Sequence, residues 1–392
     1  MENDLSSSWH SEENSTFADD ETGYTLVRNV CVIVVYGTIT LVTIIGNLLV
    51  MLAFRRDLFI SRKIANWYIL NLSAADFTVG LVSMSINLAW LLTDDWPLGE
   101  ITCKMYLVID YVVTNVPVCT IIFISLDRYW LLIKKLDYPK YQTKTRALSF
   151  IAICWTFCIV FFTFITFAWI PITGFPEQIE YDWNCELEAT YNFEFQIFMT
   201  VLFFLFPLLT IGCLNLIVYR NIRQRSKGFV RVHPAPAELP VQNEHVAMDT
   251  TTKSPDGTNS GVNRGAPLIS SSANDNAPTN SATKPGNSAM NKSRNEFNRH
   301  RKAAITLAIL VGVFILCWLP FYITSLIGAV CDDCIPELTW EITSNLLWCN
   351  STINPFLYAA MNSHFRRNFI DLLGLRKWFP KTIDATPSSV AD

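Results

Sequence analysis

Long runs of apolar residues alternate with short polar segments along most of the 392-residue chain. A helix needs roughly 20 predominantly apolar residues to cross the ~30 Å hydrocarbon core of a bilayer. Seven runs are long enough, and they cover residues 29–54, 66–92, 102–134, 147–170, 193–222, 301–328 and 338–361. A single run could be the core helix of a soluble protein, but seven in series have no soluble interpretation. The pattern predicts an all-α membrane protein, a bundle of seven transmembrane helices.

The polar segments divide the chain into five predicted parts. In order these are an N-terminal tail (1–28), spans one to five (29–226), a long loop (227–298), spans six and seven (299–362) and a C-terminal segment (363–392). The long loop is rich in Pro, Ser, Asn and Thr and too poor in apolar residues to fold, so we expect it to be disordered. Basic and apolar residues alternate at helical spacing after span seven, which predicts a short amphipathic helix in the membrane interface before the C-terminal tail.

Lys and Arg gather in the loops after spans one, three, five and seven, whereas the intervening loops are acidic. Basic loops stay in the cytoplasm. We therefore expect the N-terminus outside the cell, the C-terminus inside it, and residues 227–298 as the third intracellular loop. Asn14 begins an Asn-Ser-Thr sequence in the outer tail and is predicted to be glycosylated.

Composition agrees with a membrane protein, because 51% of the residues are hydrophobic and only 16% are charged. Soluble proteins carry about 25% charged residues. A net charge of -4 gives no sign of a nucleic-acid partner. The eleven cysteines form no zinc or CxxC pattern. Because the spans also lack a serine triad, an HExxH motif, a Schiff-base lysine in span seven and internal repeats, we expect no enzyme, cofactor, pigment or transporter.

Three carboxylates interrupt the predicted spans. Asp76 lies in the middle of span two, Asp110 in the outer half of span three, and Asp127 at its inner end. Ionisable residues within a membrane are costly and usually functional. Each could simply pair with a neighbouring helix, but no Lys, Arg or His lies at the depth of Asp110 in another span. Asp110 is therefore predicted to bind an external cation.

Aromatic residues surround the predicted position of Asp110. Tyr111 follows it directly, and four others fall in the outer halves of spans six and seven, namely Trp318, Phe321, Tyr322 and Trp348. A carboxylate with aromatic faces is a common way to hold an ammonium group. The alternative is simple packing or anchoring at the interface, which we prefer for Trp340 near its helix end.

Several short motifs lie on the predicted spans. In chain order they are Gly46-Asn47, Asn71-Leu72 with Ala75-Asp76, Asp127-Arg128-Tyr129, Trp155, Cys317-Trp318-Leu319-Pro320, and Asn354-Pro355 with Tyr358. With these motifs the sequence resembles the rhodopsin-like G-protein-coupled receptors, outside the N-terminus and the long loop. The resemblance implies a plasma-membrane receptor that couples to a heterotrimeric G protein, with a receptor kinase and arrestin as further partners.

The same resemblance implies roles for individual residues. Asp127 would hold Arg128 at rest, beside Tyr129, and release it toward the G protein on activation. Trp318 would be a switch below the ligand, and Asn354, Pro355 and Tyr358 would rearrange with it. Two disulfides are implied, Cys103–Cys185 and Cys331–Cys334. Asp76, with Asn350 and Asn354, would form a polar network able to hold a sodium ion, weakened by Pro117 in place of a hydroxyl; no other metal and no catalytic residue is expected.

Within the amine receptors the chain most resembles the muscarinic acetylcholine receptors, through Asp110-Tyr111-Val112-Val113-Thr114-Asn115. Thr114 and Asn115 are thereby candidate ligand contacts. Where muscarinic receptors have three cage tyrosines this chain has Phe321, Ser344 and Trp348, and Tyr322 replaces an asparagine. Trp348 is similar to a subset of histamine receptors, but those need an acid where Phe203 stands. A small cationic amine is therefore expected, acetylcholine first, with histamine or another biogenic amine as the alternative.

Overall fold

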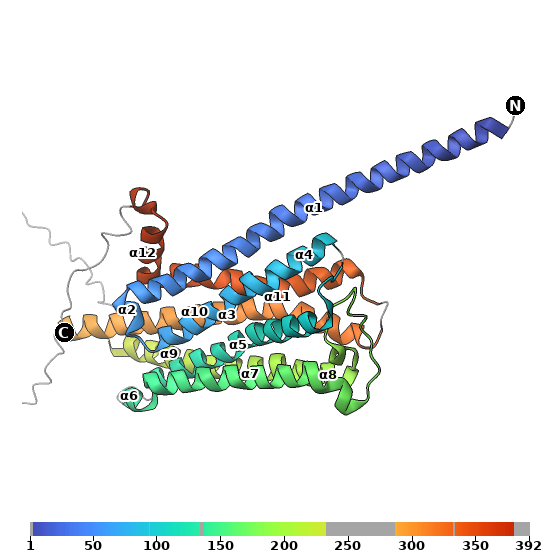
Figure 1. Cartoon of the computed structure of the whole chain (residues 1–392). Helices are drawn as coiled ribbons and strands as arrows, with labels where there is room; N and C mark the ends of the chain where they lie inside the picture. The colour runs from blue at the N-terminus through green and yellow to red at the C-terminus, as the bar shows by residue number, and fades with distance from the viewer. Residues whose placement is uncertain (1–2, 94, 134–136, 233–286, 332–333, 380–392) are drawn as a thin grey trace, which may run out of the picture. The chain divides into compact units, whose positions relative to one another are not determined.

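The computed structural model describes residues 3–93, 95–133, 137–232, 287–331 and 334–379. Within these ranges, side chains are described from Thr25 to Gln224 and from Arg301 onward, except those of 302–304, 306 and 307. Every regular element of the described ranges is helical, as predicted (Figure 1). Helices are the economical way to cross a bilayer, since each pairs its own backbone N–H and C=O groups.

The chain divides into two compact units. Residues 1–223 and 297–392 form the first unit, which is the helical bundle, and residues 224–296 form the second. The long helices of the bundle are α1 (Asn3–Arg56), α5 (Gly99–Ile133), α7 (Lys144–Thr173), α10 (Asn287–Gly328) and α11 (Glu337–Met361). Two further spans are each continued through a π-helical turn: α3 (Ala65–Thr78), η1 (Val79–Met84) and α4 (Ser85–Thr93), then α8 (Phe193–Thr200), η4 (Val201–Leu205) and α9 (Phe206–Val232). Short helices complete it: α2 (Leu58–Ser61), α6 (Tyr138–Tyr141), η3 (Glu188–Tyr191), α12 (Ser363–Leu372) and η5 (Leu375–Lys377).

Six of the described helical segments are long and apolar enough to cross a membrane by length and composition alone. They are Thr25–Arg56, Ala65–Thr93, Gly99–Ile133, Lys144–Thr173, Phe193–Gln224 and Ala308–Gly328. The predicted seventh span is present as α11 but is less apolar. The reason is that α11 has two unlike faces: Asn350, Ser351 and Asn354 are buried, whereas Ile342 and Phe356 are exposed.

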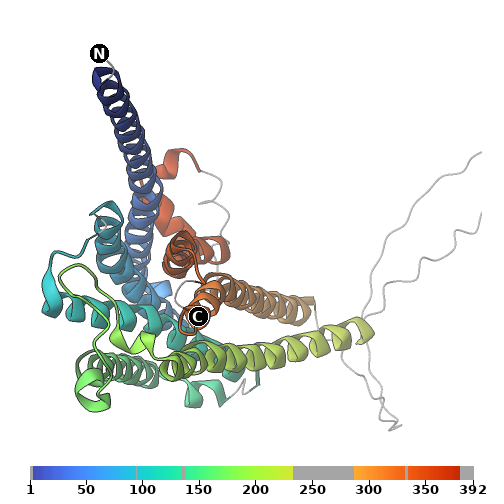
Figure 2. The ribbon, with the colours of Figure 1, turned by 90° about the vertical axis from the view of Figure 1, so that its right-hand side faces the viewer.

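Helix α5 lies between α3 and α7 and packs against both, while α1 packs against α3 and α11 (Figure 1, Figure 2). The candidate ligand aspartate is therefore on the helix with the most buried membrane-spanning stretch. By contrast α7 exposes many apolar side chains, among them Ile153, Phe157, Val160 and Phe164. Such a face is suited to contact with lipid rather than water.

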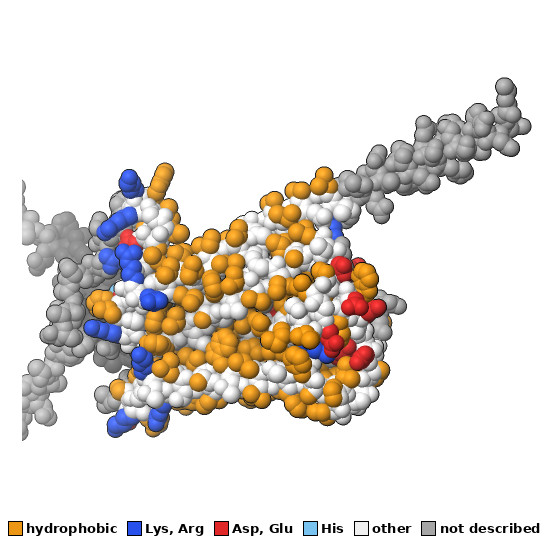
Figure 3. Space-filling view, viewed as in Figure 1, with side chains coloured by type: hydrophobic (Ala, Val, Ile, Leu, Met, Phe, Trp, Pro, Cys, Tyr) orange, Lys and Arg blue, Asp and Glu red, His pale blue; other side chains and the backbone are white. Residues whose placement is uncertain are grey.

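The two ends of the bundle differ in charge. Lys and Arg side chains gather at the end where α2, α6 and α12 lie, and Asp and Glu side chains gather at the opposite end (Figure 3). Between them the visible face is largely apolar. The charge pattern read along the sequence is thus also a separation in space.

Helix α12 is the predicted amphipathic helix after span seven. Phe365 and Ile370 are buried on one side of it, while Arg366 is exposed. Asp57, at the start of α2, fastens α12 to the bundle: its Oδ2 accepts a hydrogen bond from Asn368 at 3.0 Å and lies 3.2 Å from His364 Nδ1.

Helices extend into both flanks of the predicted long loop. The loop was predicted over 227–298, with basic flanks able to extend spans five and six as helices, and in the structure α9 continues to Val232 and α10 begins at Asn287. The basic flanks of the loop contain few helix-breaking residues, so the helices extend past the apolar runs. Residues 233–286 lie outside the described part of the chain. At the other end α1 begins at Asn3, so the predicted tail and the first span form one continuous helix.

Candidate functional site

Asp110 on α5 contacts Trp348 on α11. The indole Nε1–H of Trp348 donates to Asp110 Oδ1 at 3.0 Å, and the Thr114 hydroxyl approaches the same oxygen at 3.5 Å. Among the described residues no salt bridge joins Asp110 to a basic side chain. The carboxylate is thus held in place by neutral donors while its charge has no cationic partner within the described chain.

An aromatic cluster continues from Trp348 into α10. Trp318 and Tyr322 are buried in it together with Phe204 of η4, and Phe321 and Trp348 pack at its edge. The rings of Phe204 and Tyr322 stack with their centroids 5.0 Å apart, and those of Trp318 and Tyr322 lie 6.1 Å apart. The structure therefore brings Asp110, Thr114 and the four predicted aromatic residues of spans six and seven into one continuous set.

Other predicted ligand residues are placed differently. Tyr111 stacks on Phe162 of α7, with ring centroids 5.3 Å apart, so it belongs to the packing between α5 and α7. The Asn115 amide donates to the Tyr111 carbonyl on its own helix at 2.8 Å. Ser344 is half-buried on α11, one turn before Trp348, and Trp340 packs against Phe321 with centroids 5.9 Å apart.

The wall that span five presents near the cluster is apolar. Met199 and Phe203 are buried, and Phe203 packs on Phe162 with ring centroids 5.2 Å apart. The nearby Thr200 hydroxyl is used within its own helix, since it donates to the Gln196 carbonyl at 2.8 Å. This side of the site offers few polar partners to a ligand.

Asp127 lies at the opposite end of α5 and is fully buried. The sequence predicted that it pairs with Arg128, but its partner in the structure is a different residue. Asp127 Oδ1 accepts a hydrogen bond from the Tyr138 hydroxyl of α6 at 2.7 Å, and no salt bridge joins Asp127 to Arg128 among the described residues. Successive residues on a helix point about 100° apart, so the phenol of a neighbouring segment reaches the carboxylate more directly. Burial and the Asp127 charge raise the pKa of Tyr138, which keeps its hydroxyl protonated as a donor.

Asp76 is the centre of a buried polar network between α3 and α11. Ser351 donates to its Oδ1 at 2.8 Å and Asn354 to its Oδ2 at 2.7 Å. Asn350 was expected in this network, but it makes no hydrogen bond to Asp76 in the described contacts, and Ser351 takes that place. Asn350 and Ser351 are consecutive on the helix, so their side chains point about 100° apart. A small rotation of α11 therefore decides which of them faces Asp76.

The remaining motif residues join the helices. Pro355 lies directly against Gly46 of α1, where an added Cβ would be 3.0 Å from its ring. Tyr358 contacts the Phe365 ring of α12, with centroids 6.1 Å apart. Tyr129 packs on Leu132 of its own helix α5 and on Val218 of α9.

Both disulfides named from the sequence are present, Cys103–Cys185 and Cys331–Cys334. The first ties α5 to the segment before η3. Glu188, the first residue of η3, is buried and accepts backbone hydrogen bonds from Gln178 at 2.8 Å and Ile179 at 3.2 Å. Asn14, the predicted glycosylation site, lies outside the residues whose side chains the structure describes.

Four features were not predicted from the sequence. Three are hydrogen bonds: from Trp348 to Asp110, from Tyr138 to Asp127, and from the Gln178 backbone to Glu188. The fourth is the cluster of Cys119, Cys154 and Cys158. Only the last had a signal along the chain, because Cys154 and Cys158 are one helical turn apart on span four. The others depend on contacts between distant segments.

Comparison with known proteins identifies the family. The profile of the 7 transmembrane receptor (rhodopsin family) matches residues 46–358. A chain named probable G-protein coupled receptor No18, of Amphibalanus amphitrite, is 29% identical over 351 residues, which cover 86% of this chain and 87% of that one. A muscarinic acetylcholine receptor of Gallus gallus is 25% identical, covering 90% and 91%, and a 5-hydroxytryptamine receptor of Homo sapiens is 28% identical, covering 88% of each. The chain belongs to the rhodopsin family of seven-transmembrane, G-protein-coupled receptors, and is a multi-pass protein of the plasma membrane.

Proposed function

We propose that this receptor binds a small cationic amine at Asp110 and signals to a heterotrimeric G protein. The observation that carries the proposal is the Asp110 carboxylate: it is fixed by Trp348 and Thr114, lacks a basic partner among the described residues and adjoins the aromatic cluster of α10 and α11. An ammonium group supplies the missing charge, and the aromatic faces favour it further. Trp318, Phe321, Tyr322 and Ser344 would line the remainder, and Tyr111 and Asn115 would support α5 from behind.

Acetylcholine is the amine that fits best. The apolar span-five wall of Met199 and Phe203 has no partner for a ring hydroxyl or an imidazole, whereas acetylcholine needs mainly an anion and aromatic faces. Relatives named for acetylcholine and for 5-hydroxytryptamine match to a similar extent. Histamine or another biogenic amine is the second candidate, supported by Trp348 and by the 5-hydroxytryptamine receptor relative.

The inner half would carry the signal. In this proposal the N-terminus is extracellular and the C-terminus cytoplasmic, because the basic end of the bundle carries α2, α6 and α12 (Figure 3). Residues 1–28, with Asn14 glycosylated, would face outward, and 227–298 and 363–392 would face the cytoplasm. Arg128 and Tyr129 would meet the G protein after Asp127 rearranges, with Asn354, Pro355 and Tyr358 moving in the same step. Receptor kinase and arrestin would act at this surface, and Asp76 would hold sodium.

The test is an agonist panel on transfected cells. Acetylcholine, histamine, serotonin, dopamine, tyramine and octopamine are applied while calcium and cAMP are recorded, with Asp110→Asn beside the wild type. Losing one partner of a buried charge pair costs about 3–5 kcal/mol, so the best agonist is expected to lose at least about a hundredfold in potency. Glu341→Gln is the matched control, because Glu341 is also an outer carboxylate but is already 3.8 Å from Arg28.

The results of the panel test both the identity of the amine and the role of Asp110. Acetylcholine as the most potent agonist supports the first candidate, and histamine or serotonin in its place selects the second. A loss below about tenfold in Asp110→Asn, or an equal loss in Glu341→Gln, contradicts Asp110 as the anchor of the ligand. An Arg128→Ala variant that binds agonist but does not signal is the expected result for the inner half.

A further inference from the structure

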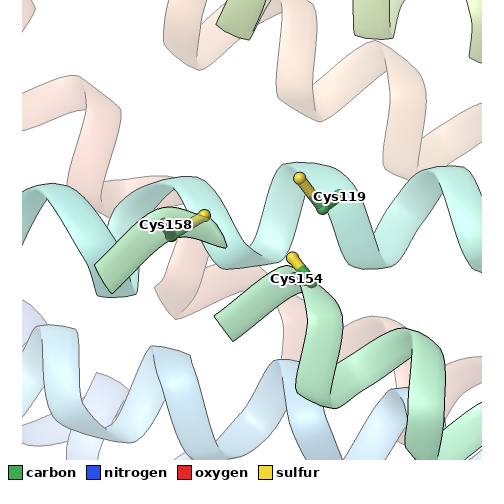
Figure 4. Close-up of side chains that lie close together, drawn as sticks. All are labelled: Cys119, Cys154 and Cys158. Atoms are coloured by element: carbon green, nitrogen blue, oxygen red, sulfur yellow. The ribbon is translucent and has the colours of Figure 1, made fainter. Parts of the chain in front are cut away.

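Three cysteine side chains meet between α5 and α7. Cys119 projects from α5, and Cys154 and Cys158 come from successive turns of α7 (Figure 4). Their three Sγ atoms all lie within 4.8 Å of one another, and none of the three is in a disulfide. Two helices therefore supply three sulfur ligands that converge on one point.

The surroundings of these sulfurs are dry and apolar. Cys154 is 5% exposed and Cys158 is fully buried, and both belong to an apolar cluster that includes Val116 and Phe162. No His, Asp or Glu of the described residues joins the three thiols in the set. A ligand held here would be coordinated by sulfur alone.

The spacing suits a single metal ion. Three sulfurs that each lie about 2.3 Å from one ion are about 3.8 Å apart at tetrahedral angles and about 4.0 Å apart in a trigonal plane. Sulfurs already within 4.8 Å of one another reach either distance through side-chain adjustments of about 1 Å or less. The backbones of α5 and α7 can remain where they are.

The softness of the ligands and their number select the ion. Thiol ligands favour soft ions such as Cu(I) and Zn²⁺. Zn²⁺ structural sites use four ligands, and this apolar site offers three. Cu(I) is stable with three sulfurs. The thiolate, rather than the thiol, is the metal ligand, so each sulfur that binds Cu(I) releases one H⁺ to solvent.

We propose that Cys119, Cys154 and Cys158 form a three-sulfur binding site for Cu(I) that fastens α5 to α7. The site lies beside an existing joint: Trp155, next to Cys154, donates to Asn71 Oδ1 at 2.7 Å, and Asn71 donates to Thr120, next to Cys119, at 2.8 Å. Copper would thus restrain the contact that already connects α3, α5 and α7. An ion bound only by the folded receptor raises its stability by mass action.

The test uses the full-length receptor, purified without oxygen in lipid nanodiscs and titrated with Cu(I) against a chromogenic Cu(I) chelator. One Cu(I) per chain is expected, with a shell of three sulfurs in X-ray absorption and a higher unfolding temperature. Cys119→Ser and Cys158→Ser keep the side-chain size but remove a ligand. Changes to outer partners of a metal site already cost about 10–100-fold in affinity, so each variant is expected to bind at least about tenfold more weakly.

Controls make each outcome decisive. Cys213→Ser removes an exposed thiol of α9 and is expected to bind Cu(I) like the wild type. Metal-free unfolding curves show whether each variant is folded, and the sulfur shell of the wild type tests the site even where a variant is not. Equal Cu(I) retention in wild type and Cys119→Ser overturns the site. One-to-one binding of Zn²⁺ or Cd²⁺ at these cysteines, with no retention of Cu(I), overturns the choice of a monovalent ion.

Discussion

The indole N–H of Trp348 donates a hydrogen bond to the carboxylate of Asp110, so α11 fixes the orientation of the charge carried by α5. A tryptophan at this position acts in two ways at once, as a polar donor and as part of the aromatic cluster. Its contribution can be separated by removing the donor while keeping an aromatic ring.

Trp348→Phe is expected to lower the potency of the best amine agonist by about tenfold, because a hydrogen bond to a charged group contributes about 1.5–3 kcal/mol and part of that fixes the carboxylate. Trp348→Tyr, which restores a donor, is expected to lose less. Concentration–response curves measure both, with Trp340→Phe as the control at the edge of the cluster. Equal curves for Trp348→Phe and the wild type would show that the donor does not position Asp110.

Tyr138→Phe removes the donor to the buried Asp127 Oδ1. An unsatisfied buried acceptor costs about 1–3 kcal/mol, so the resting state is expected to weaken and signalling without agonist to rise. The raised pKa of Tyr138 means that the phenol stays protonated at neutral pH and loses this bond only in alkali, so the wild-type basal signal should not vary across the neutral range. Basal second-messenger levels test this, with the exposed Tyr219→Phe as control. A basal signal in Tyr138→Phe no higher than in wild type contradicts it.

Gly46→Ala and Gly212→Ala form a matched pair. An added methyl at Gly46 meets the rigid Pro355 ring at 3.0 Å, whereas at Gly212 nothing lies within 4 Å. Overpacking costs about 1–3 kcal/mol, while alanine in an open helical position gains up to about 1 kcal/mol over glycine. Thermal unfolding should therefore show a lower midpoint for the first and an equal or higher one for the second. If both variants shift in the same direction, the contact between α1 and α11 is not tight.

Glu188→Ala should loosen the segment from Gln178 to Glu188, which contains Cys185. It leaves the backbone N–H groups of Gln178 and Ile179 without their acceptor, at a cost of about 1–3 kcal/mol for the buried Ile179, whereas the exposed Gln178 can turn to water. Hydrogen exchange at these two amides is expected to accelerate, and bound agonist to dissociate faster. The exposed Glu177→Ala should change neither. Unchanged exchange in Glu188→Ala would mean that the disulfide alone holds this segment.

The sequence predicted best those features that depend on one helix alone, such as its bounds and the depth of a residue along it. Span three was predicted as 102–134 and is Gly99–Ile133, because the length of an apolar run is a local property that the bilayer thickness selects. The depth of Asp110 and Asp127 on that helix follows from the rise per residue. These features need no knowledge of the neighbouring helices.

Pairings between helices could not be predicted in the same way. Whether Asp127 meets Arg128 or Tyr138, and whether Asp76 meets Asn350 or Ser351, depends on the rotation of each helix about its axis, and one residue changes that direction by about 100°. The convergence of Cys119 with Cys154 likewise depends on how α5 and α7 cross. Apolar periodicity is too weak on helices with lipid on one side to set these angles.

The two unlike faces of α11 have a consequence for biosynthesis. A helix that carries Asn350, Ser351 and Asn354 on one side gains less from entering lipid alone than the six more apolar helices do. It is also the last of the long helices to leave the ribosome. Its insertion therefore depends on partners already in the membrane, α1 and α3, which accept its polar side through Asn47 and Asp76. Receptors whose first helices are damaged should fail by leaving this last helix outside the bilayer.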